Sequence, residues 1–443
     1  MIEISIKKLI YKKFFFLNKT VIIKGWIKYF RNNKFLILND GSTIKNLQIV
    51  ITDILYKKYK KNIGNYVAVS IIGVVKKQLK YKKEIEIICE KIFFYSSPYN
   101  IQKTILQKKT HNLEKVREQL HLRFYTNFFS AVTRIRHYIS IFIHNYFHKK
   151  NFFYIHTPII TKNNSEGTGD MIKVINNKNN KNNCYLSVSG QLEAEAAALS
   201  LGKVYTFGPV FRGENSNTFR HLSEFWMIEP EISFFNLDDI IDFSEKFLKK
   251  IIKFIINNCE DDLNFLSKKL EEKKKENLFF RLKNILKNKF LKISYTDSIN
   301  ILKKNNFSIS WGEDLQSIHE RFLVEKYFKN TLIIYNYPKE IKPFYMFLNN
   351  DEKTVRAIDI LFPKIGEIIG GSQREDRYDV LLNNFKKKSI NINKLNWYLE
   401  TRIFGNLPHS GFGLGFDRLV QFITGMDNIR DVIPFPITPN YFY

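Results

Sequence analysis

Short runs of β-branched and aromatic residues alternate with polar positions from residue 21 to about 94. Five such runs follow one another, and Asn39-Asp40-Gly41 supplies a turn between the second and the third. They read VIIKGWI, NKFLIL, NLQIVI, NYVAVSIIGVV and EIEIICEKIFF. This spacing predicts a small barrel of five strands. The five-stranded OB-fold is a common oligonucleotide-binding barrel of this size, although other small β-barrels fit the pattern equally well.

The apolar spacing changes at Thr126, after which apolar residues recur every three or four positions as far as Phe147. This period predicts a long amphipathic helix, which ends before His156-Thr157-Pro158. Residues 95–124, between the barrel and this helix, carry many charges and the run Ser96-Ser97-Pro98, a composition typical of a hinge.

The remaining chain alternates between helical and strand-like patterns. A helix is predicted at 192–201, closed by Gly202, and an antiparallel hairpin at 203–212 and 224–234. Further segments are Lys-rich amphipathic helices at 237–257 and 261–290, strands at 333–336, 355–362 and 366–370, and a last helix at about 414–424 capped by Gly425. Because the strands have antiparallel connections with helices between them, we expect an α+β fold, and no Rossmann or P-loop fingerprint occurs.

Composition narrows the possible partners. The 443 residues include 70 Lys and Arg against 43 Asp and Glu, and the net charge of +27 favours a polyanion such as RNA. An AT-rich coding bias toward Lys, Asn, Ile and Phe explains part of this excess, so charge alone does not identify the partner. Three widely spaced cysteines predict neither a disulfide framework nor a zinc site, and they fit a reducing cytoplasm. No apolar run is long enough to predict a membrane span.

Two segments resemble signature motifs of a known family. FRGENSNTFRHLSEFWMIEPE at 211–231 resembles motif 2 of the class II aminoacyl-tRNA synthetases, and GFGLGFDRLVQFITGMDNIRDVIP at 411–434 resembles their motif 3. The long helix and Pro158 match motif 1, which pairs two subunits in this family, more loosely. The resemblance is closest to the asparaginyl/aspartyl/lysyl branch and spans nearly the whole chain.

The resemblance implies a domain organisation. We expect an OB-fold anticodon-binding domain at 1–100, a hinge at 101–124, and at 125–443 a class II catalytic domain built on an antiparallel sheet with flanking helices. Within the catalytic domain the expected parts are motif 1 at about 131–158, motif 2 at about 204–234, a helical insertion at about 237–330 and motif 3 at about 411–434. The implied substrates and partners are ATP with Mg²⁺, L-asparagine, tRNA(Asn) and a second copy of the chain in a homodimer, and the expected compartment is the cytoplasm.

The chemistry of the family explains the residue types of motif 2. An amino-acid carboxylate attacks the α-phosphate of ATP, so the site must hold two anions together and neutralise the charge that develops between them. By resemblance, Arg212 bridges the two anions with a bidentate geometry that lysine lacks. Phe225 and Arg418 match the two faces of the adenine clamp. The ATP-binding set is completed by Glu214, Arg220 and His221.

A carboxylate in EIIGGSQRED matches the group that holds Mg²⁺ on the phosphates in this family. That residue is Glu367, and Asp359 and Ser372 are weaker candidates for the same metal.

The choice of amino acid is predicted from SVSGQLEAE at 187–195 together with Arg374. In aspartyl relatives the corresponding run resembles S-P-Q-L-x-K, whose lysine neutralises the substrate carboxylate, whereas Ala194 stands at that position here. We expect Glu195 to accept a hydrogen bond from the substrate amide and to repel aspartate, and Arg374 to donate to the amide oxygen. The other residues expected to hold the amino acid are Glu166, Ser189, Gln191 and Glu229, of which Glu166 and Glu229 match partners of the ammonium group.

In this branch the OB domain reads the anticodon. Phe35 is predicted to stack on a splayed base, Gln48 to hydrogen-bond a neighbouring base edge, and Glu86 to contact the first anticodon base.

The predicted activity is the ATP-dependent activation of asparagine followed by transfer to its tRNA. An aspartyl enzyme is the nearest alternative. A non-catalytic tRNA-binding relative would be expected to lack ATP-site residues, yet Arg212, Phe225, Glu367, Arg374 and Arg418 are all present. A stand-alone amide-forming paralogue would be expected to lack the OB domain.

Overall fold

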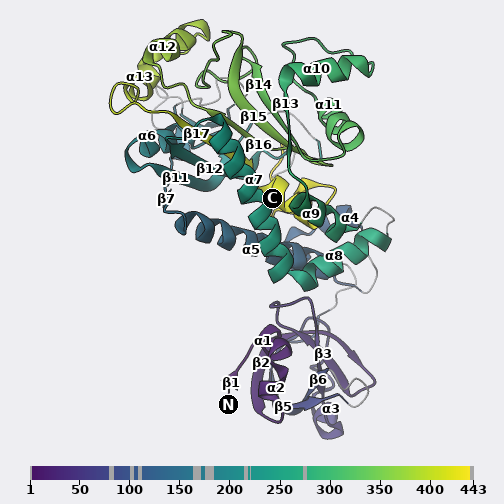
Figure 1. Ribbon diagram of the computed structural model, residues 1–443. Coiled ribbons are helices and arrows are strands. Elements are labelled where there is room, and N and C mark those ends of the chain that lie inside the picture. Colours follow the sequence, from purple (N-terminus) through teal and green to yellow (C-terminus); the bar gives the residue numbers. More distant parts are fainter. Residues whose placement is uncertain are drawn as a thin grey trace. The chain divides into compact units, whose positions relative to one another are not determined.

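The computed structural model describes residues 2–78, 84–99, 104–107, 112–162, 171–174, 184–213, 218–219, 221–272 and 277–439. The chain forms two compact units (Figure 1): Met1–Arg134 with Cys259–Lys274, and Ile135–Asn258 with Lys275–Tyr443. The helix α8 (Glu260–Glu272) therefore groups with the first unit, although it comes from the middle of the sequence. The functional domain bounds inferred from the sequence stay a prediction.

A closed barrel dominates the first unit and confirms the predicted OB-fold. Its strands are β2 (Thr20–Arg31), β3 (Phe35–Asn39), β4 (Leu47–Val50), β5 (Ala68–Lys77) and β6 (Ile85–Phe94). They pair in the order β2-β3-β4-β6-β5, and β2 also pairs with β5, which closes the barrel. Alternate residues of each strand point inward, so Ile23, Leu36, Ile49 and Ile87 are fully buried. The expected turn after β3 is present, because Gly41 has φ 81° and its N–H donates to Asn39 Oδ1 (2.8 Å).

Short elements precede and interrupt the barrel. They are β1 (Ile2–Glu3), α1 (Ile6–Tyr11), α2 (Lys13–Phe16) and α3 (Asp53–Tyr59), and α4 (Leu113–Arg117) with a 3₁₀ turn (Leu120–Tyr125) follows it. The side chain of Ser5 caps α1, and Asp40 Oδ2 accepts from the Ile6 N–H (2.7 Å), so α1 is fixed to the end of β3. The segment expected as a hinge thus contains helical turns.

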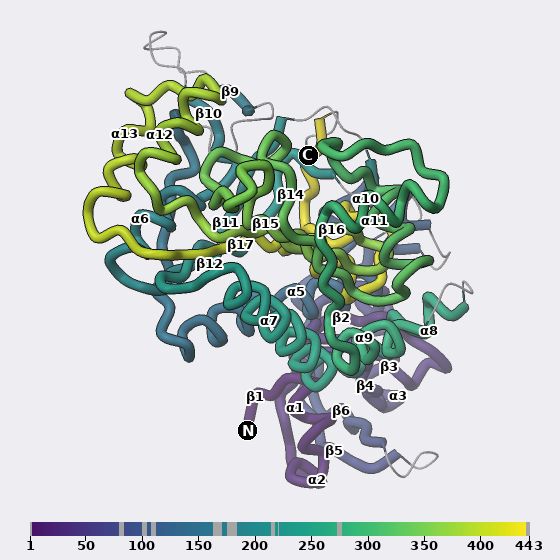
Figure 2. The backbone as a smooth tube through the Cα atoms, turned by 45° about the horizontal axis from the view of Figure 1, so that its top comes forward, coloured from purple at the N-terminus to yellow at the C-terminus, as the bar shows by residue number. Residues whose placement is uncertain are grey.

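The second unit is built on an eight-stranded mixed sheet with helices on it (Figure 2). The strand order is β13-β14-β15-β16-β17-β12-β11-β7. The strands are β7 (Phe153–Tyr154), β11 (Lys203–Phe211), β12 (Glu224–Ser233), β13 (Leu291–Ser294), β14 (Leu332–Pro338), β15 (Thr354–Phe362), β16 (Gly366–Gln373) and β17 (His409–Gly415). The six central strands are antiparallel, as predicted, whereas the edge pairs β7–β11 and β13–β14 are parallel. A separate small sheet contains β8 (Ile160–Thr161), β9 (Lys173–Val174) and β10 (Cys184–Leu186).

Helices follow the predicted period with different bounds. The long helix is α5 (Asn127–His148), and the others are α6 (Gln191–Leu201), α7 (Leu237–Asn258), α9 (Leu278–Lys287), α10 (Tyr295–Lys304), α11 (Ser317–Arg321), α12 (Tyr378–Lys387), α13 (Ile392–Glu400) and α14 (Phe416–Thr424). The helical segments predicted at 237–257 and 261–290 correspond to α7 and to α8 with α9, where α8 ends at Glu272 and α9 begins at Leu278. Gly202 and Gly425 close α6 and α14 with positive φ, as expected.

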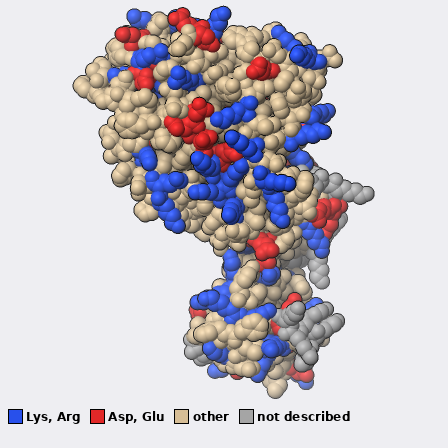
Figure 3. Space-filling view, viewed as in Figure 1, with Lys and Arg blue, Asp and Glu red and all other residues tan. Residues whose placement is uncertain are grey.

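Charged residues on α7 and α9 gather on one face of the second unit. In Figure 3, Lys and Arg side chains cluster over these two helices. Among the described residues, no helix is both long and apolar enough for a membrane span.

Candidate active site

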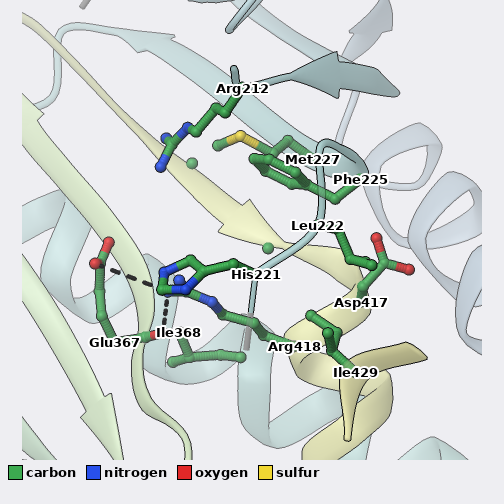
Figure 4. A pocket seen from close by; sticks show the side chains of 12 residues that line it. Arg212, His221, Leu222, Phe225, Met227, Glu367, Ile368, Asp417, Arg418 and Ile429 are labelled. Atoms are coloured by element: carbon green, nitrogen blue, oxygen red, sulfur yellow. Dashed lines mark hydrogen bonds and ion pairs between the residues drawn. The ribbon is translucent and has the colours of Figure 1, made fainter. Parts of the chain in front are cut away.

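A pocket of about 730 Å³ forms where the β11–β12 hairpin meets β16, β17 and α14 (Figure 4). The lining residues come from sequence positions far apart and are Arg212, His221, Leu222, Phe225, Met227, Glu367, Ile368, Gly413, Gly415, Asp417, Arg418 and Ile429. Five residues that the sequence assigned to ATP are therefore brought together, namely Arg212, His221, Phe225, Glu367 and Arg418. The order of strands in the sheet explains why these distant residues meet. Motif 2 supplies β12, motif 3 supplies β17, and these two strands are neighbours.

A cation and an aromatic ring lie together at the mouth of the motif 2 hairpin. The backbone N–H of Arg212 donates to the Ser223 carbonyl (3.0 Å), which continues the hairpin past the end of β11. This register puts the guanidinium carbon of Arg212 5.4 Å from the ring centre of Phe225. The pocket can thus accept a flat aromatic group with an anionic tail.

The opposite wall carries a second cation beside a carboxylate. Arg418 Nη1 donates to the Glu367 carbonyl (3.0 Å) and lies 3.9 Å from Glu367 Oε2 (Figure 4). Because this anchor fixes the guanidinium at the first turn of α14, Arg418 is placed to cover a ring that enters from the open side.

Asp417 lines the pocket but its carboxylate points away from the other polar groups, as Figure 4 shows. It accepts from the Trp226 N–H (2.8 Å) and forms an ion pair with Arg136 of α5. Asp417 therefore ties α5, β12 and α14 together.

Three glycines of β17 lie in one row on the sheet face that runs from this pocket to Glu231, a row here called the groove. Gly415 is opposite Met227 and Gly411 is opposite Glu231 in the sheet register, so Gly411, Gly413 and Gly415 share the face of the pocket. A Cβ atom at Gly413 would overlap Met227, and one at Gly411 would overlap the Glu231 carboxylate. Glycine is thus required at 411 and 413 because the Glu231 and Met227 side chains occupy the space of a Cβ atom there.

A buried ion pair closes the far end of the groove. Arg374 donates from Nε (3.1 Å) and Nη2 to the two carboxylate oxygens of Glu231, and from Nη1 to Ser372 Oγ (2.8 Å). The side chains of Arg374 and Glu231 are 2% and 0% exposed. Burial raises the pKa of Glu231 to about 7, and the Arg374 guanidinium opposes this rise. One guanidinium and one carboxylate side by side match the two halves of an amide.

Sequence reasoning missed Glu231, although a signal was present. Glu229 and Glu231 are two residues apart on a strand, so they share one face of the sheet. An assignment of Glu229 to the pocket therefore implied that Glu231 faces it as well.

Ser372 is wrong as a metal candidate. Its hydroxyl is fully buried, accepts from Arg374, and lies in the sheet row of Gly411 and Glu231. Glu367 pairs with Leu361, further along β15 from Ala357, the partner of Ser372. Glu367 and Ser372 thus lie at different ends of β16, and only Glu367 lines the pocket.

Glu367 and Asp359 fit a magnesium site in part. A Cβ atom at Gly370 would lie 2.8 Å from Glu367 Oε1 and 3.6 Å from Asp359 Oδ1, so both carboxylates border this glycine. Asp359 Oδ2 accepts from Lys342 Nζ (2.7 Å). Within the described ranges no cluster of three His, Cys, Asp or Glu could hold a metal by itself. One or two carboxylates completed by phosphate oxygens and water is the usual arrangement for Mg²⁺, and these residues fit it.

The start of α6 holds three of the predicted amino-acid contacts. Glu229 accepts from the Gly190 N–H (3.1 Å), from Thr206 Oγ1 (2.8 Å) and from Ser189 Oγ. This carboxylate thus fixes the turn into α6. Gln191 Nε2 is buried and has no hydrogen-bond partner among the described residues. Because buried polar groups are normally hydrogen-bonded, this amide group is suited to donate to a ligand.

Glu195 is not placed as the sequence predicted. Its carboxylate is fully buried and accepts from Tyr398 Oη (2.7 Å to Oε1), His409 Nε2 (2.9 Å) and Arg402 Nη2. Although burial opposes the shift, Arg402 and the hydrogen bond from His409 lower the pKa of Glu195 well below its usual range. Glu195 thus belongs to an internal ion-pair network and is not among the residues that line the pocket, so its predicted contact with the substrate amide has no support from this geometry.

The predicted anticodon residues lie on adjacent strands of the barrel. Gln48 pairs with Ile37 of β3 and with Glu86 of β6, and its Nε2 donates to Glu86 Oε2 (2.6 Å). Arg31, which the sequence reading did not single out, donates to Gln48 Oε1 (2.8 Å) and lies 5.8 Å from the ring centre of Phe35. The structure thus brings Phe35, Gln48 and Glu86 to one surface.

Three predicted site residues, Glu166, Glu214 and Arg220, lie outside the described residues. Their proposed contacts with the ammonium group and ATP stay predictions.

Several known asparagine–tRNA ligases are similar to this chain over nearly its whole length. The chain is 47% identical to the asparagine–tRNA ligase of Cytophaga hutchinsonii, with 99% of each chain covered, and 46% identical to that of Borrelia garinii, with 96% of this chain and 97% of the relative covered. The crystal structure of asparaginyl-tRNA synthetase from Pyrococcus horikoshii complexed with asparaginyl-adenylate matches 97% of each chain with a TM-score of 0.86 and 32% identity.

The family assignment follows from these matches and from the pocket. Residues 112–439 match the profile of the family described as tRNA synthetases class II (D, K and N). This range contains every element that lines the pocket and the groove. The chain belongs to the class II tRNA synthetases of the D, K and N group.

Proposed function

We propose that this chain is an asparagine–tRNA ligase, which activates L-asparagine with ATP and transfers it to tRNA(Asn). The observation that carries the proposal is the buried Glu231–Arg374 pair, which lies on the same sheet face as the pocket beside Arg212 and Phe225. We propose that the pocket binds the nucleotide and that the pair contacts the side-chain amide of the amino acid. The names of the full-length relatives support the same assignment.

Arg212 is the residue proposed to act in the transition state. Its guanidinium bridges the amino-acid carboxylate and the α-phosphate, so it stabilises the charge that develops as the new bond forms and pyrophosphate leaves. Phe225 and Arg418 hold the adenine ring from opposite sides. Magnesium, bound by Glu367 and Asp359 with the phosphates, would neutralise phosphate charge and favour departure of pyrophosphate. His221, which borders the pocket, is placed for the outer phosphates.

Asparagine is chosen by the buried pair at the end of the groove. The amide nitrogen donates to Glu231, and the amide oxygen accepts from Arg374. Aspartate would put a second carboxylate against Glu231, with one guanidinium to neutralise both, in a region closed to water. Ala194, buried on α6, offers no cation to offset that charge.

The nearest competing function is aspartate activation, and pyrophosphate exchange decides between them. Purified enzyme is assayed with ATP, labelled pyrophosphate and asparagine, aspartate or lysine in parallel. We expect exchange with asparagine and little with the other two. Equal exchange with aspartate and asparagine would contradict the assignment and favour the aspartyl alternative.

We also propose that two copies pair through the region of α5 and β7, in the cytoplasm. Apolar side chains are exposed there at Ile141 on α5 and at Phe153 and Tyr154 on β7. β7 is an edge strand, and edges with apolar side chains invite pairing. Light scattering of the purified protein tests the proposed dimer. A molecular mass equal to that of one chain at assay concentrations would contradict it.

A further inference from the structure

The two short helices ahead of the barrel leave aromatic rings in solvent. The rings of Phe14 and Phe15 are 78% and 63% exposed, whereas Phe16 is buried in the barrel core. Phe16 thus anchors α2, and this anchor holds two neighbouring phenylalanines on the outside. An exposed aromatic pair costs solvation free energy in an isolated protein and is typical of a contact surface.

Lysines surround these rings. Lys19 Nζ lies 3.8 Å from the ring centre of Phe15. A shallow groove of about 910 Å³ beside it is lined by Ile2, Lys8, Lys12, Phe14, Phe15 and Phe16, without a carboxylate. Rings that alternate with ammonium groups suit a ligand with flat bases and a phosphate backbone. A protein partner would need a carboxylate opposite each of these lysines to offset the cost of their desolvation.

The same surface adjoins the predicted anticodon face of the barrel. Lys76 Nζ donates to Asn18 Oδ1 (3.0 Å), at the turn between α2 and β2. On β5, Lys76 is the register partner of Glu86, whose side chain bonds Gln48. The outward-facing positions of the barrel therefore run from Gln48 and the buried Glu86 to the exposed Lys76, which bonds Asn18 beside α2.

We propose that Phe14, Phe15, Lys8, Lys12 and Lys19, here called the aromatic-lysine surface, form a second RNA contact that stacks on an unpaired nucleotide of the bound tRNA. The proposal rests on the function proposed above. Because every base presents a π face, such stacking adds affinity with little dependence on base identity. The surface would thus strengthen tRNA binding without a role in amino-acid activation.

The test measures binding of an unmodified asparagine tRNA transcript to the full-length protein over a series of salt concentrations. Phe14→Ala/Phe15→Ala should weaken binding by about 5-fold to 150-fold, the range for loss of one stacked base. Lys8→Ala/Lys12→Ala should make the plot of log binding constant against log salt concentration less steep. The slope should fall in magnitude by up to about 0.9 for each phosphate contact that is lost. Phe280→Ala and Phe404→Ala remove rings that are 68% and 74% exposed in the second unit, and these matched controls should bind like the wild type.

Two results would overturn the proposal. One is wild-type tRNA affinity in Phe14→Ala/Phe15→Ala. The other is a change of that variant's oligomeric state in light scattering, which would make the surface a contact between subunits. Pyrophosphate exchange with asparagine is measured on the same preparations and should be unchanged. If the wild type itself shows no such exchange, the proposed activity fails, whereas the binding comparison still decides the RNA contact.

Discussion

At the residue scale, the two arginines of the groove differ in what surrounds them. Arg374 is fully buried and bonded to Glu231 and Ser372, so its position is fixed before a ligand arrives. Arg212 borders an open pocket, with Phe225 beside it. The first arrangement suits recognition of a neutral side chain, and the second suits a cation that meets two anions.

The role of Arg212 is tested by Arg212→Lys. An ammonium group cannot hold two anions in one plane, so kcat for pyrophosphate exchange should fall by roughly 10²-fold or more. The melting temperature should stay within a few degrees of the wild type, because the side chain lines a pocket. Exchange close to the wild-type rate in this variant would remove Arg212 from the mechanism.

The role of Glu231 predicts a pH dependence. Its pKa is raised to about 7 by burial, so the carboxyl group is neutral below and ionised above that pH. Only the ionised form can accept from the amide nitrogen with either oxygen while it accepts from Arg374, and the neutral form can donate to aspartate. We therefore expect kcat/KM for asparagine, and its ratio to kcat/KM for aspartate, to rise as pH increases through about 7.

Glu231→Gln supplies the control for that profile, since it cannot titrate. Its ratio of asparagine to aspartate should be lower and independent of pH in this range. The effect on stability has the opposite sign: the folded protein holds this proton more tightly than the unfolded chain, so the stabilisation is present at low pH and lost as pH rises through about 7. A wild-type ratio that does not vary with pH would contradict the proposed role.

Sequence reasoning found the residue types of the site better than their contacts. Resemblance to the family motifs assigned Arg212, Phe225 and Glu367 to ATP and its magnesium, and the structure brings them to one pocket. It assigned Glu195 to the substrate from a local motif. The ion pair of Glu195 with Arg402 could not be foreseen, because Arg402 lies 207 positions away in the sequence. Buried ion pairs between distant segments cannot be recognised from local patterns.

At the scale of elements, buried carboxylates fix the start and the middle of α6. Glu229 holds the turn into α6 through Ser189 and Gly190, and Glu195 joins the middle of the helix to Tyr398 of α13 and to Arg402, which follows α13. The same carboxylate accepts from His409, the first residue of β17. Glu195 thus links the helix that carries Gln191 to the strand that floors the groove.

Glu195→Ala should therefore destabilise the fold and disturb the pocket indirectly. It leaves the guanidinium of Arg402 buried without its carboxylate, and loss of one partner from a buried ion pair costs about 3–5 kcal/mol. Thermal and urea unfolding measure this change. Glu193→Gln, at a half-buried position of the same helix, is the matched control and should change stability by less than about 1 kcal/mol. A stability loss equally small for Glu195→Ala would contradict the linking role.

Strand β17 could not be predicted from the sequence pattern. Its run HSGFGLG has three glycines on one face, and glycine weakens the alternation that marks a strand. The sequence therefore predicted a helix from about 414, whereas the helix begins at Phe416. The glycines are needed because Met227 and Glu231 pack against them, so the same residues that serve the site obscure the strand pattern.

At the scale of the whole molecule, the chain assigns two tasks to two compact units. The ATP-type pocket and the groove lie in the second unit, and the surface with Phe35, Gln48 and Glu86 lies in the first. Activation of asparagine needs residues of the second unit alone, whereas charging also needs the tRNA to be held. A change on the barrel surface should thus affect one reaction and spare the other.

Phe35→Ala tests this division. Loss of one stacked base should weaken tRNA charging, measured as kcat/KM for tRNA, by about 1–3 kcal/mol, and pyrophosphate exchange without tRNA should match the wild type. Phe93→Ala removes a ring that is 52% exposed on β6, away from the pairing of Gln48 with Glu86, and this control should leave both reactions unchanged. If Phe35→Ala lowered both reactions to the same extent, a folding defect would explain the loss better than anticodon stacking. A selective loss in Phe35→Ala, together with normal charging by the control, would place the anticodon contact on the face formed by β3, β4 and β6.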